Sequence, residues 1–257
     1  MYPSTSPVLE LKQVSHRFDR ISALHHLNLQ IRSGERVALI GSSGAGKSTL
    51  LKLLNGTLLP TQGEVWALGY PLSQLSGSKR RRVQRQIGTI YQQFHLVDNL
   101  AVIHNVNAGH LGTWPFWKAA LSLLYPLEVE TAAKALHRVG IPEKLYERTD
   151  RLSGGQQQRV AIARVLVQNP AIILADEPVA SLDPERSREI MALLQSLVQD
   201  LRRTLIISLH SVELAQIYCD RIIGLRHGQI MFDVPAAQLT TAMIDDLYRL
   251  KSPESPA

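Results

Sequence analysis

Runs of apolar residues divide this chain into strands. Two stretches, 9–12 and 27–32, alternate apolar with polar residues, which predicts strands that each bury one face. The run at 171–175 is fully apolar, which is typical of a strand at the centre of a parallel sheet. Two further runs, at 36–40 and 205–209, are apolar apart from Arg36 and Ser208, and we expect them to form buried strands as well.

Shorter apolar runs predict further strands. Residues 65–68 and 87–91 have the length and composition of short strands. Near the end of the chain, the runs at 222–225 and 230–232 flank a His-Gly pair, which predicts a hairpin.

A helical pattern without any convincing strand occupies residues from about 100 to 170. Apolar residues there recur three and four positions apart, and a further helix is expected at 156–168. The chain 1–257 is therefore predicted to be one domain, in which a helical subdomain at 100–170 is inserted into an α/β core formed by 1–99 and 171–245.

Composition favours a globular chain without a membrane span. Hydrophobic residues make up 45% of the sequence, which is enough for a sizeable core. No apolar run approaches the ~18 residues that a span needs, and Met1–Pro7 lacks the features of a secretory signal. The single cysteine, Cys219, excludes an internal disulfide, and its apolar helical surroundings favour a buried and inert thiol.

The chain carries a net charge of +6, and five of its cations cluster at 79–82 and at Arg85. The plainer interpretation is a solvated helix face, and the alternatives are contact with a lipid surface or with nucleic acid. Because no aromatic residues interleave with these cations, we expect no nucleic-acid partner. The nearby Trp-Pro-Phe-Trp segment at 114–117 is either a partner-docking patch or ordinary packing.

A phosphate-binding loop follows the strand at 36–40. It fits the pattern G-x-x-x-x-G-K-[ST] and is formed by Gly41, Ser42, Ser43, Gly44, Ala45, Gly46, Lys47, Ser48 and Thr49. Glycines let successive N–H groups point at an anion, and the following helix adds its positive N-terminal end. Lys47 supplies a charge for the β- and γ-phosphates, and the Ser48 hydroxyl is placed to ligate Mg²⁺.

A second candidate anion site opens the helix at 156–168. It consists of Leu152, Ser153, Gly154, Gly155 and Gln156. The alternative is an ordinary helix start without a ligand, because Ser153 as the N-cap would be enough to cap the helix.

Two adjacent acids, Asp176 and Glu177, end the apolar strand at 171–175. Asp176 can hold Mg²⁺ through its water shell. The alternation of a strand would turn Glu177 the other way, where it can polarise the attacking water. The alternative is a pair of acids that cap a helix.

Three more polar residues stand at strand or helix ends. His210 follows the strand at 205–209 and can reach a γ-phosphate as a donor, and Gln92 offers a carbonyl for a metal and a donor for water. Asp183 precedes Pro184, which predicts an N-cap and a first helical turn.

In this order, the motifs resemble the ATP-binding subunit of ABC transporters, over about Leu9 to Thr240. The resemblance implies a P-loop NTPase core of mainly parallel sheet, an antiparallel β region and an inserted helical subdomain. It also implies Mg²⁺-dependent ATP hydrolysis coupled to transport. Phe18 would stack on adenine, Glu177 and His210 would be catalytic, and Mg²⁺ would be held by Ser48, Gln92 and Asp176.

The same resemblance implies a head-to-tail homodimer. ATP would lie between Lys47 and Ser48 of one copy and Ser153, Gly154 and Gly155 of the other, with Asp183 at the dimer seam. The dimer would work at the cytoplasmic face of the bacterial inner membrane, as a peripheral protein with two integral-membrane permease subunits and a periplasmic or lipid-anchored solute-binding protein. Gln92 and the helical insertion would face the permease.

Four segments are similar to the ATP-binding subunit of bacterial phosphonate importers: 90–98, 111–130, 177–183 and 208–225. Importers of phosphite or of another small solute can share them. A soluble ABC protein of DNA repair or translation is a rival of another class, but the chain has one cassette and no heptad run. A third rival is a module that binds ATP without hydrolysing it, and the presence of Glu177 and His210 argues against it.

Overall fold

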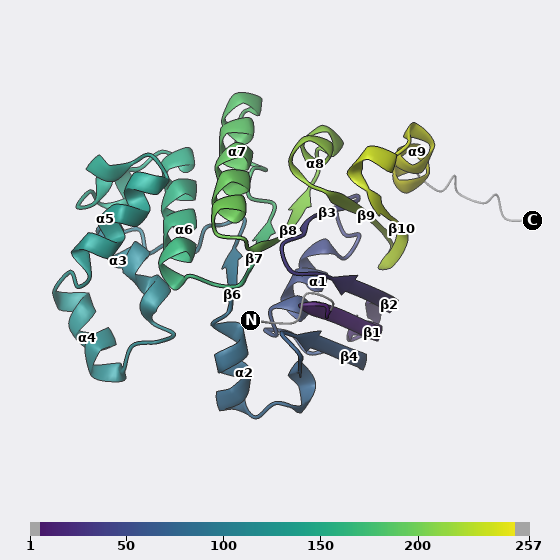
Figure 1. Cartoon of the computed structure of the whole chain (residues 1–257), viewed down its shortest axis with the longest axis horizontal. Coiled ribbons are helices and arrows are strands. Elements are labelled where there is room, and N and C mark those ends of the chain that lie inside the picture. The colour runs from purple at the N-terminus through teal and green to yellow at the C-terminus, as the bar shows by residue number, and fades with distance from the viewer. Residues whose placement is uncertain (1–5, 250–257) are drawn as a thin grey trace, which may run out of the picture.

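A four-stranded antiparallel sheet lies beside a six-stranded sheet in the computed structural model, which describes residues 6–249 (Figure 1). Most of the segment Met1–Pro7, on which the secretory signal was excluded, therefore lies outside the described residues. The smaller sheet has the order β2-β1-β4-β5, and its strands are β1 (Leu9–Phe18), β2 (Ile21–Ile31), β4 (Gln62–Ala67) and β5 (Tyr70–Pro71).

The six-stranded sheet has the order β10-β9-β3-β8-β7-β6. Its strands are β3 (Arg36–Ile40), β6 (Ile87–Ile90), β7 (Ile172–Asp176), β8 (Thr204–Leu209), β9 (Arg221–Arg226) and β10 (Gln229–Pro235). All neighbours pair in parallel except β10, which returns antiparallel along β9. Ile40 is level with Leu209, and Asp176 is level with Ser208, so the carboxyl ends of β3, β7 and β8 meet at one edge.

Four α-helices between β6 and β7 gather at one end of the molecule, and the last of them packs against β6 (Figure 1). They are α3 (Val102–Asn107), α4 (Phe116–Leu124), α5 (Val129–Arg138) and α6 (Gly154–Gln168). The remaining helices are α1 (Lys47–Leu54), α2 (Gly77–Gln84), α7 (Pro184–Asp200), α8 (Val212–Tyr218) and α9 (Thr241–Tyr248). The division into a core and a helical subdomain at 100–170 stays a prediction.

The largely apolar runs are explained by two hydrophobic cores on opposite faces of the larger sheet. Ala38 and Ile40 of β3 belong to the core that also contains α6 and α7. Val37 and Leu39 belong to the other, which contains α1 and the inner face of the smaller sheet. Successive side chains of such a strand point alternately into the two cores, so most of them are apolar. The alternation of apolar and polar residues that marks a half-exposed strand is therefore absent.

The predicted strands all exist, but two of them are much longer than expected, because β1 ends at Phe18, six residues past its predicted end, and β2 begins at Ile21, six residues before its predicted start. The strand expected at 65–68 begins three residues earlier, at Gln62, where β4 pairs with Ser15 of β1. Cys219 is buried as expected, but it lies directly after α8 instead of inside a helix. Among residues 6–249, no helix is long and apolar enough to cross a membrane.

Candidate functional site

The phosphate loop joins the end of β3 to the first turn of α1. Gly44 and Gly46 have φ angles of +77° and +105°, a region that favours glycine. Gly46 is the N-cap of α1, and no side chain accepts a hydrogen bond from the first turn of that helix. Ser42, Ser43 and Gly44 are exposed. The N–H groups of the loop and helix are thus available to an anion.

Close packing behind the loop fixes its path. A Cβ on Gly41 would lie 2.1 Å from the Leu225 carbonyl oxygen, and one on Gly46 would lie 2.7 Å from Leu24 Cδ2. The Gly228 N–H, in the turn between β9 and β10, donates to the Ala45 carbonyl at 3.0 Å. Strands from both sheets therefore hold the loop, and larger residues at these glycines would displace it.

Lys47 lies inside the loop, with only 3% of its surface exposed. Its Nζ donates to the Gly41 carbonyl at 2.8 Å and to the Ser42 carbonyl at 3.2 Å, and it lies 3.7 Å from Glu177 Oε1. Burial lowers the pKa of Lys47, and the nearby Glu177 carboxylate opposes that shift. The ammonium group is therefore held at the centre of the loop, where it can meet a phosphate.

Asp176 ends β7 beside the first turn of α1. Its Oδ1 accepts hydrogen bonds from Ser48 Oγ at 3.0 Å and from Ser208 Oγ at 2.8 Å. Carboxylate and hydroxyl oxygens are the ligands that Mg²⁺ prefers, so Ser48 and Asp176 fit this ion. Among residues 6–249 there is no cluster of three His, Cys, Asp or Glu side chains, so such an ion would need phosphate or water oxygens as well.

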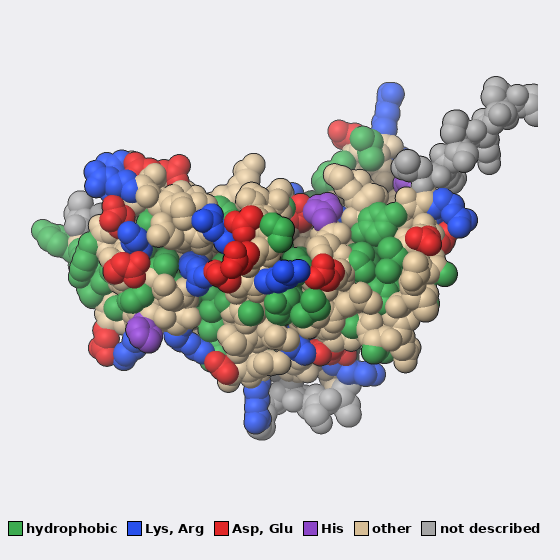
Figure 2. Space-filling view, turned by 90° about the horizontal axis from the view of Figure 1, so that it is seen from above, with side chains coloured by type: hydrophobic (Ala, Val, Ile, Leu, Met, Phe, Trp, Pro, Cys, Tyr) green, Lys and Arg blue, Asp and Glu red, His purple; other side chains and the backbone are tan. Residues whose placement is uncertain are grey.

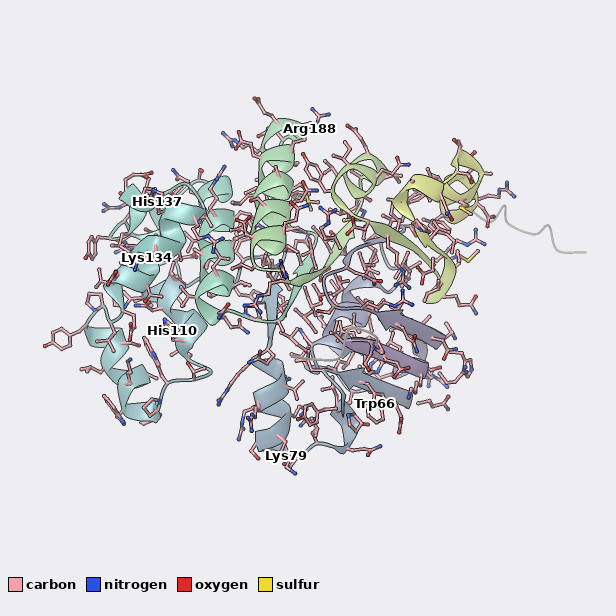
Figure 3. All side chains as sticks on the ribbon, viewed as in Figure 1. Trp66, Lys79, His110, Lys134, His137 and Arg188 are labelled. Atoms are coloured by element: carbon pink, nitrogen blue, oxygen red, sulfur yellow. The ribbon has the colours of Figure 1, made fainter. Side chains whose placement is uncertain are left out.

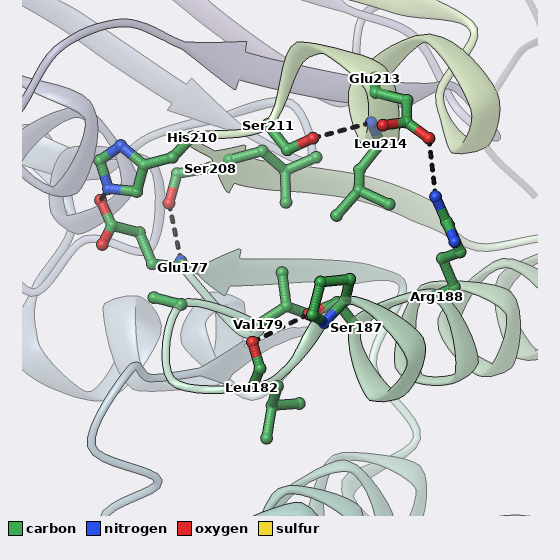
Figure 4. A pocket seen from close by; sticks show the side chains of 13 residues that line it. Glu177, Val179, Leu182, Ser187, Arg188, Ser208, His210, Ser211, Glu213 and Leu214 are labelled. Carbon is green, nitrogen blue, oxygen red and sulfur yellow. Dashed lines mark hydrogen bonds and ion pairs between the residues drawn. The ribbon is translucent and has the colours of Figure 1, made fainter.

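Glu177 takes its direction from its own backbone and not from the pleat of the strand. The strand β7 ends at Asp176, and Glu177 has a φ of +47°. Its N–H donates to Ser208 Oγ at 2.8 Å, and its Oε1 lies 2.7 Å from His210 Nε2 (Figure 4). The expected alternation along the strand was the wrong reason for its orientation, since the left-handed turn sets it.

Glu177 and His210 lie at one end of a cavity of about 370 Å³. The segment 179–184 and the start of α8 line the rest of it (Figure 4). Lys47, Asp176, Glu177 and His210 therefore form one connected cluster at the carboxyl edge of the sheet.

Ser208 is a functional residue that the sequence interpretation missed. It is fully buried on β8 and connects the two acids, because its Oγ donates to Asp176 and accepts from the Glu177 backbone. Its signal was a single polar residue in the apolar run 205–209. A hydroxyl in the middle of a buried strand needs partners, so it points to polar groups on the neighbouring strand.

The second candidate site begins α6. Ser153 accepts from the Gln156 N–H at 3.4 Å, and the Gln156 side chain accepts from the Ser153 N–H at 2.9 Å, which forms a capping box. The helix-cap interpretation of Ser153 is thus confirmed. Leu152 is buried in the core, whereas nothing lies within 4 Å of the Cβ position of Gly154.

Asp183 lies near this second group. It is the predicted N-cap of α7 and accepts from the Arg186 N–H at 3.0 Å, which lowers the pKa of its carboxyl group. The Cβ position of Gly155 is 3.9 Å from Arg186 Cδ. Within the described part of the chain, no hydrogen bond or ion pair joins Ser153–Gln156 to the phosphate loop. The predicted residues therefore fall into two groups.

Phe18 and Gln92 contact neither group through a hydrogen bond. Phe18 ends β1 with 46% of its surface exposed, and its ring packs edge-on against His16. Gln92 is exposed in the turn after β6, and its side chain makes no hydrogen bond to the described residues. Their roles at a nucleotide stay predictions.

The chain is similar to known proteins over nearly its whole length. Residues 24–180 match the family described as ABC transporter. The phosphonates import ATP-binding protein PhnC of Lactobacillus gasseri is 44% identical, over 96% of this chain and 95% of that protein. PhnC of Pseudomonas fluorescens is 43% identical, over 97% and 94%.

Two solved structures share the fold. CbiO1 from Clostridium perfringens, part of the ABC transporter complex cbiONQ, has a TM-score of 0.78 at 30% identity and covers 91% of this chain and 90% of its own. The ATP-binding cassette MJ0796, a dimer in a post-hydrolysis state with ADP and Pi, has a TM-score of 0.76 at 32% identity and covers 89% and 98%. The expected α/β architecture is therefore confirmed.

Proposed function

The chain belongs to the ABC transporter family of ATP-binding proteins, and we propose that it hydrolyses ATP to drive an importer of phosphonates. Support for the cargo comes from relatives named as phosphonate import proteins, at 43–44% identity over nearly the full chain. An ATPase subunit does not touch the cargo, so no residue described here identifies it.

For hydrolysis, we assign a role to each residue of the connected cluster. The loop N–H groups and Lys47 would hold the phosphates, and Ser48 and Asp176, with Gln92, would hold Mg²⁺, which neutralises charge on the phosphates. Glu177 would accept the proton of the attacking water, with His210 beside it as a donor to the γ-phosphate. Phe18 would stack on the adenine ring.

A second copy would complete the site. Each chain carries two groups of predicted residues that no hydrogen bond or ion pair joins within residues 6–249, and the similar cassette MJ0796 is a dimer with ADP and Pi. In a head-to-tail dimer, Gly154 and Gly155 of one copy would close over the γ-phosphate in the loop of the other, and Asp183 would lie at the seam. In this arrangement, the exposed start of α6 would bind the γ-phosphate held by the other copy.

A groove between the core and the helical segment is a docking site for the permease. It has a volume of about 420 Å³ and is lined by Gln84, Tyr91, His95, Gly109 and Arg164 among others. Arg164 of α6 donates to the carbonyls of Phe94 and His95, both at 2.7 Å. A partner in this groove would thus contact the segment after Gln92 and α6 together.

Growth of the native host tests this proposal. Deletion of the gene should abolish growth on a phosphonate as sole phosphorus source and leave growth on phosphate unchanged. Wild-type protein should restore growth, whereas Lys47→Ala and Glu177→Gln should not. If the deletion strain grows normally on phosphonates but loses growth on phosphite, the cargo assignment is wrong and the ATPase assignment is kept.

A further inference from the structure

The positive charge of this protein is concentrated in one quarter of its length. Residues 65–127 contain six Lys or Arg and a single acid, Asp98. This segment therefore carries +5 of the net +6, and the rest of the chain is nearly balanced. The cations lie on α2 or directly after it, apart from Lys118 on α4, which forms an ion pair at 2.8 Å with Glu128, just past this segment.

Helix α4 presents large apolar side chains to solvent. Phe116 is 89% exposed and Trp117 is 67% exposed, and Leu121 and Tyr125 are exposed as well. Trp114, by contrast, stacks on His110 at 5.0 Å between ring centroids, so it belongs to local packing. Trp and Phe on a short apolar helix are typical of segments that enter the headgroup region of a membrane.

The end of the basic helix approaches the segment just before the apolar helix. A Cβ on Gly112, just before α4, would lie 3.0 Å from Cγ of Arg85, the C-cap of α2. The proposed permease groove runs between them, since Gln84 of α2 and Gly109 before α4 both line it. In Figure 1 both helices lie along the lower edge, and in Figure 3 Lys79 points out from that edge.

The opposite side of the molecule differs. Figure 2 shows acidic and basic side chains interspersed over α5, α6 and α7. Many of them form ion pairs, such as Arg159 with Glu189 at 2.9 Å and Arg138 with Asp200 at 3.4 Å. The Lys and Arg residues of α2, in contrast, form no ion pair within residues 6–249. Within the described residues, cations outside any ion pair also occur elsewhere, for example at Arg17, Arg20 and Lys52, but on α2 four of them are consecutive in the sequence.

We propose that this edge, formed by α2 and α4, binds the surface of a bilayer rich in anionic phospholipids. Exposed cations on α2 would attract the headgroups, and Phe116 and Trp117 would insert at the acyl boundary. The inference rests on the proposed function in one respect, that the groove between these helices faces a membrane-embedded permease. It adds a second contact, made with the lipid itself, that would hold the cassette in its working orientation.

Charge and chemistry favour lipid over other partners. A lipid surface offers both headgroup charge and an apolar boundary, which matches cations and aromatics side by side. Single-stranded nucleic acid is typically bound by aromatic side chains among the cations, and α2 (Gly77–Gln84) has none, whereas a duplex would leave the apolar side chains of α4 without a partner.

Vesicle binding by the full-length chain tests the proposal without any permease. The chain should float with vesicles of phosphatidylcholine and phosphatidylglycerol and bind roughly tenfold less to phosphatidylcholine alone, and high salt should weaken binding. Arg81→Glu and the double variant Phe116→Ala, Trp117→Ala should each lose roughly tenfold in affinity. The matched controls are Lys134→Glu and Tyr146→Ala, exposed residues outside the edge, which should bind as wild type.

ATPase rates and melting temperatures show whether the variants are folded. None of these residues belongs to the site assigned above, so both measurements should match wild type. If Arg81→Glu and Lys134→Glu weaken binding equally, attraction is nonspecific and the proposal is wrong. Binding only when the permease is present in the vesicles would assign the edge to the permease. Both results leave the ATPase assignment intact.

Discussion

Glu177 shows how one residue can be positioned by three neighbours at once. Its backbone has a φ of +47°, its N–H is held by Ser208, and its carboxylate lies between Lys47 Nζ and His210 Nε2. A non-glycine residue in the left-handed region is unusual and persists only where its surroundings fix it. The carboxylate is thus set in place before any ligand arrives, which suits a base that must face an attacking water.

Replacing Glu177 by Gln should keep the fold and remove the base. We expect ATP turnover to fall on the order of 10²–10⁴-fold, because a positioned proton acceptor contributes about that much. Nucleotide binding should remain, and dimers should persist in ATP when followed by light scattering. An unchanged turnover in Glu177→Gln would show that another group takes the proton.

The thiol of Cys219 should be unreactive in the native protein. Burial raises its pKa to about 12, so the native thiol stays protonated where the unfolded thiol ionises. The unfolded state then binds fewer protons above pH ~9, and the free energy of unfolding falls as pH rises through that range. At pH 8, a chromogenic thiol reagent should modify Cys219 at a rate no higher than the rate of unfolding of the chain. Rapid labelling without denaturant would contradict this.

Helix α7 links the two groups of site residues. It begins at Asp183, a few residues after Glu177, and its first turn carries Arg186 beside Gly155. Asp183 accepts from the Arg186 N–H at 3.0 Å and forms an ion pair with the Arg186 side chain at 3.3 Å. A shift of this helix start would therefore reach both Glu177, the proposed base, and the proposed second anion site at the start of α6.

Substitutions at Asp183 should separate its structural role from its role in a dimer. Asp183→Ala should lower the free energy of unfolding by about 1 kcal/mol, the usual loss for an N-cap, and Asp183→Asn should retain the cap. If the carboxylate also acts at the dimer seam, the variant Asp183→Asn should fold normally but hydrolyse ATP more slowly. Denaturant unfolding and ATPase rates distinguish the structural role from the role in the dimer. Full ATPase activity of Asp183→Asn would show that Asp183 acts as a helix cap alone.

Strands were easier to predict than site geometry. Largely apolar runs identified β3, β7 and β8, since most side chains of a strand between two cores are buried among apolar neighbours. Spacing identified the phosphate loop, whose function lies in its backbone. The Glu177 turn and the Ser208 bridge could not be predicted, because each depends on strands that are neighbours in space and distant in sequence. Exposure of Phe116 and Trp117 was also beyond prediction, as it depends on what covers α4.

At the scale of the whole molecule, the proposed function depends on a site that one chain leaves incomplete. The phosphate loop, the acids and His210 meet at one sheet edge, whereas within residues 6–249 no hydrogen bond or ion pair joins the exposed start of α6 to that edge. Two copies arranged head to tail would turn both features into two complete ATP sites. Opening and closing of the dimer would then move the two grooves proposed to bind the permease, one on each copy.

Mixing two inactive variants tests this account most directly. Lys47→Ala removes the charge in the loop, and Gly154→Glu places a carboxylate into open space at the start of α6, where folding is not disturbed. Each variant alone should be inactive. Their mixture should recover up to about a quarter of the wild-type ATPase rate, because random pairing makes about half of the dimers mixed, each with one intact site of two. A mixture that stays inactive, or Gly154→Glu alone at the wild-type rate, would contradict a site shared between two chains.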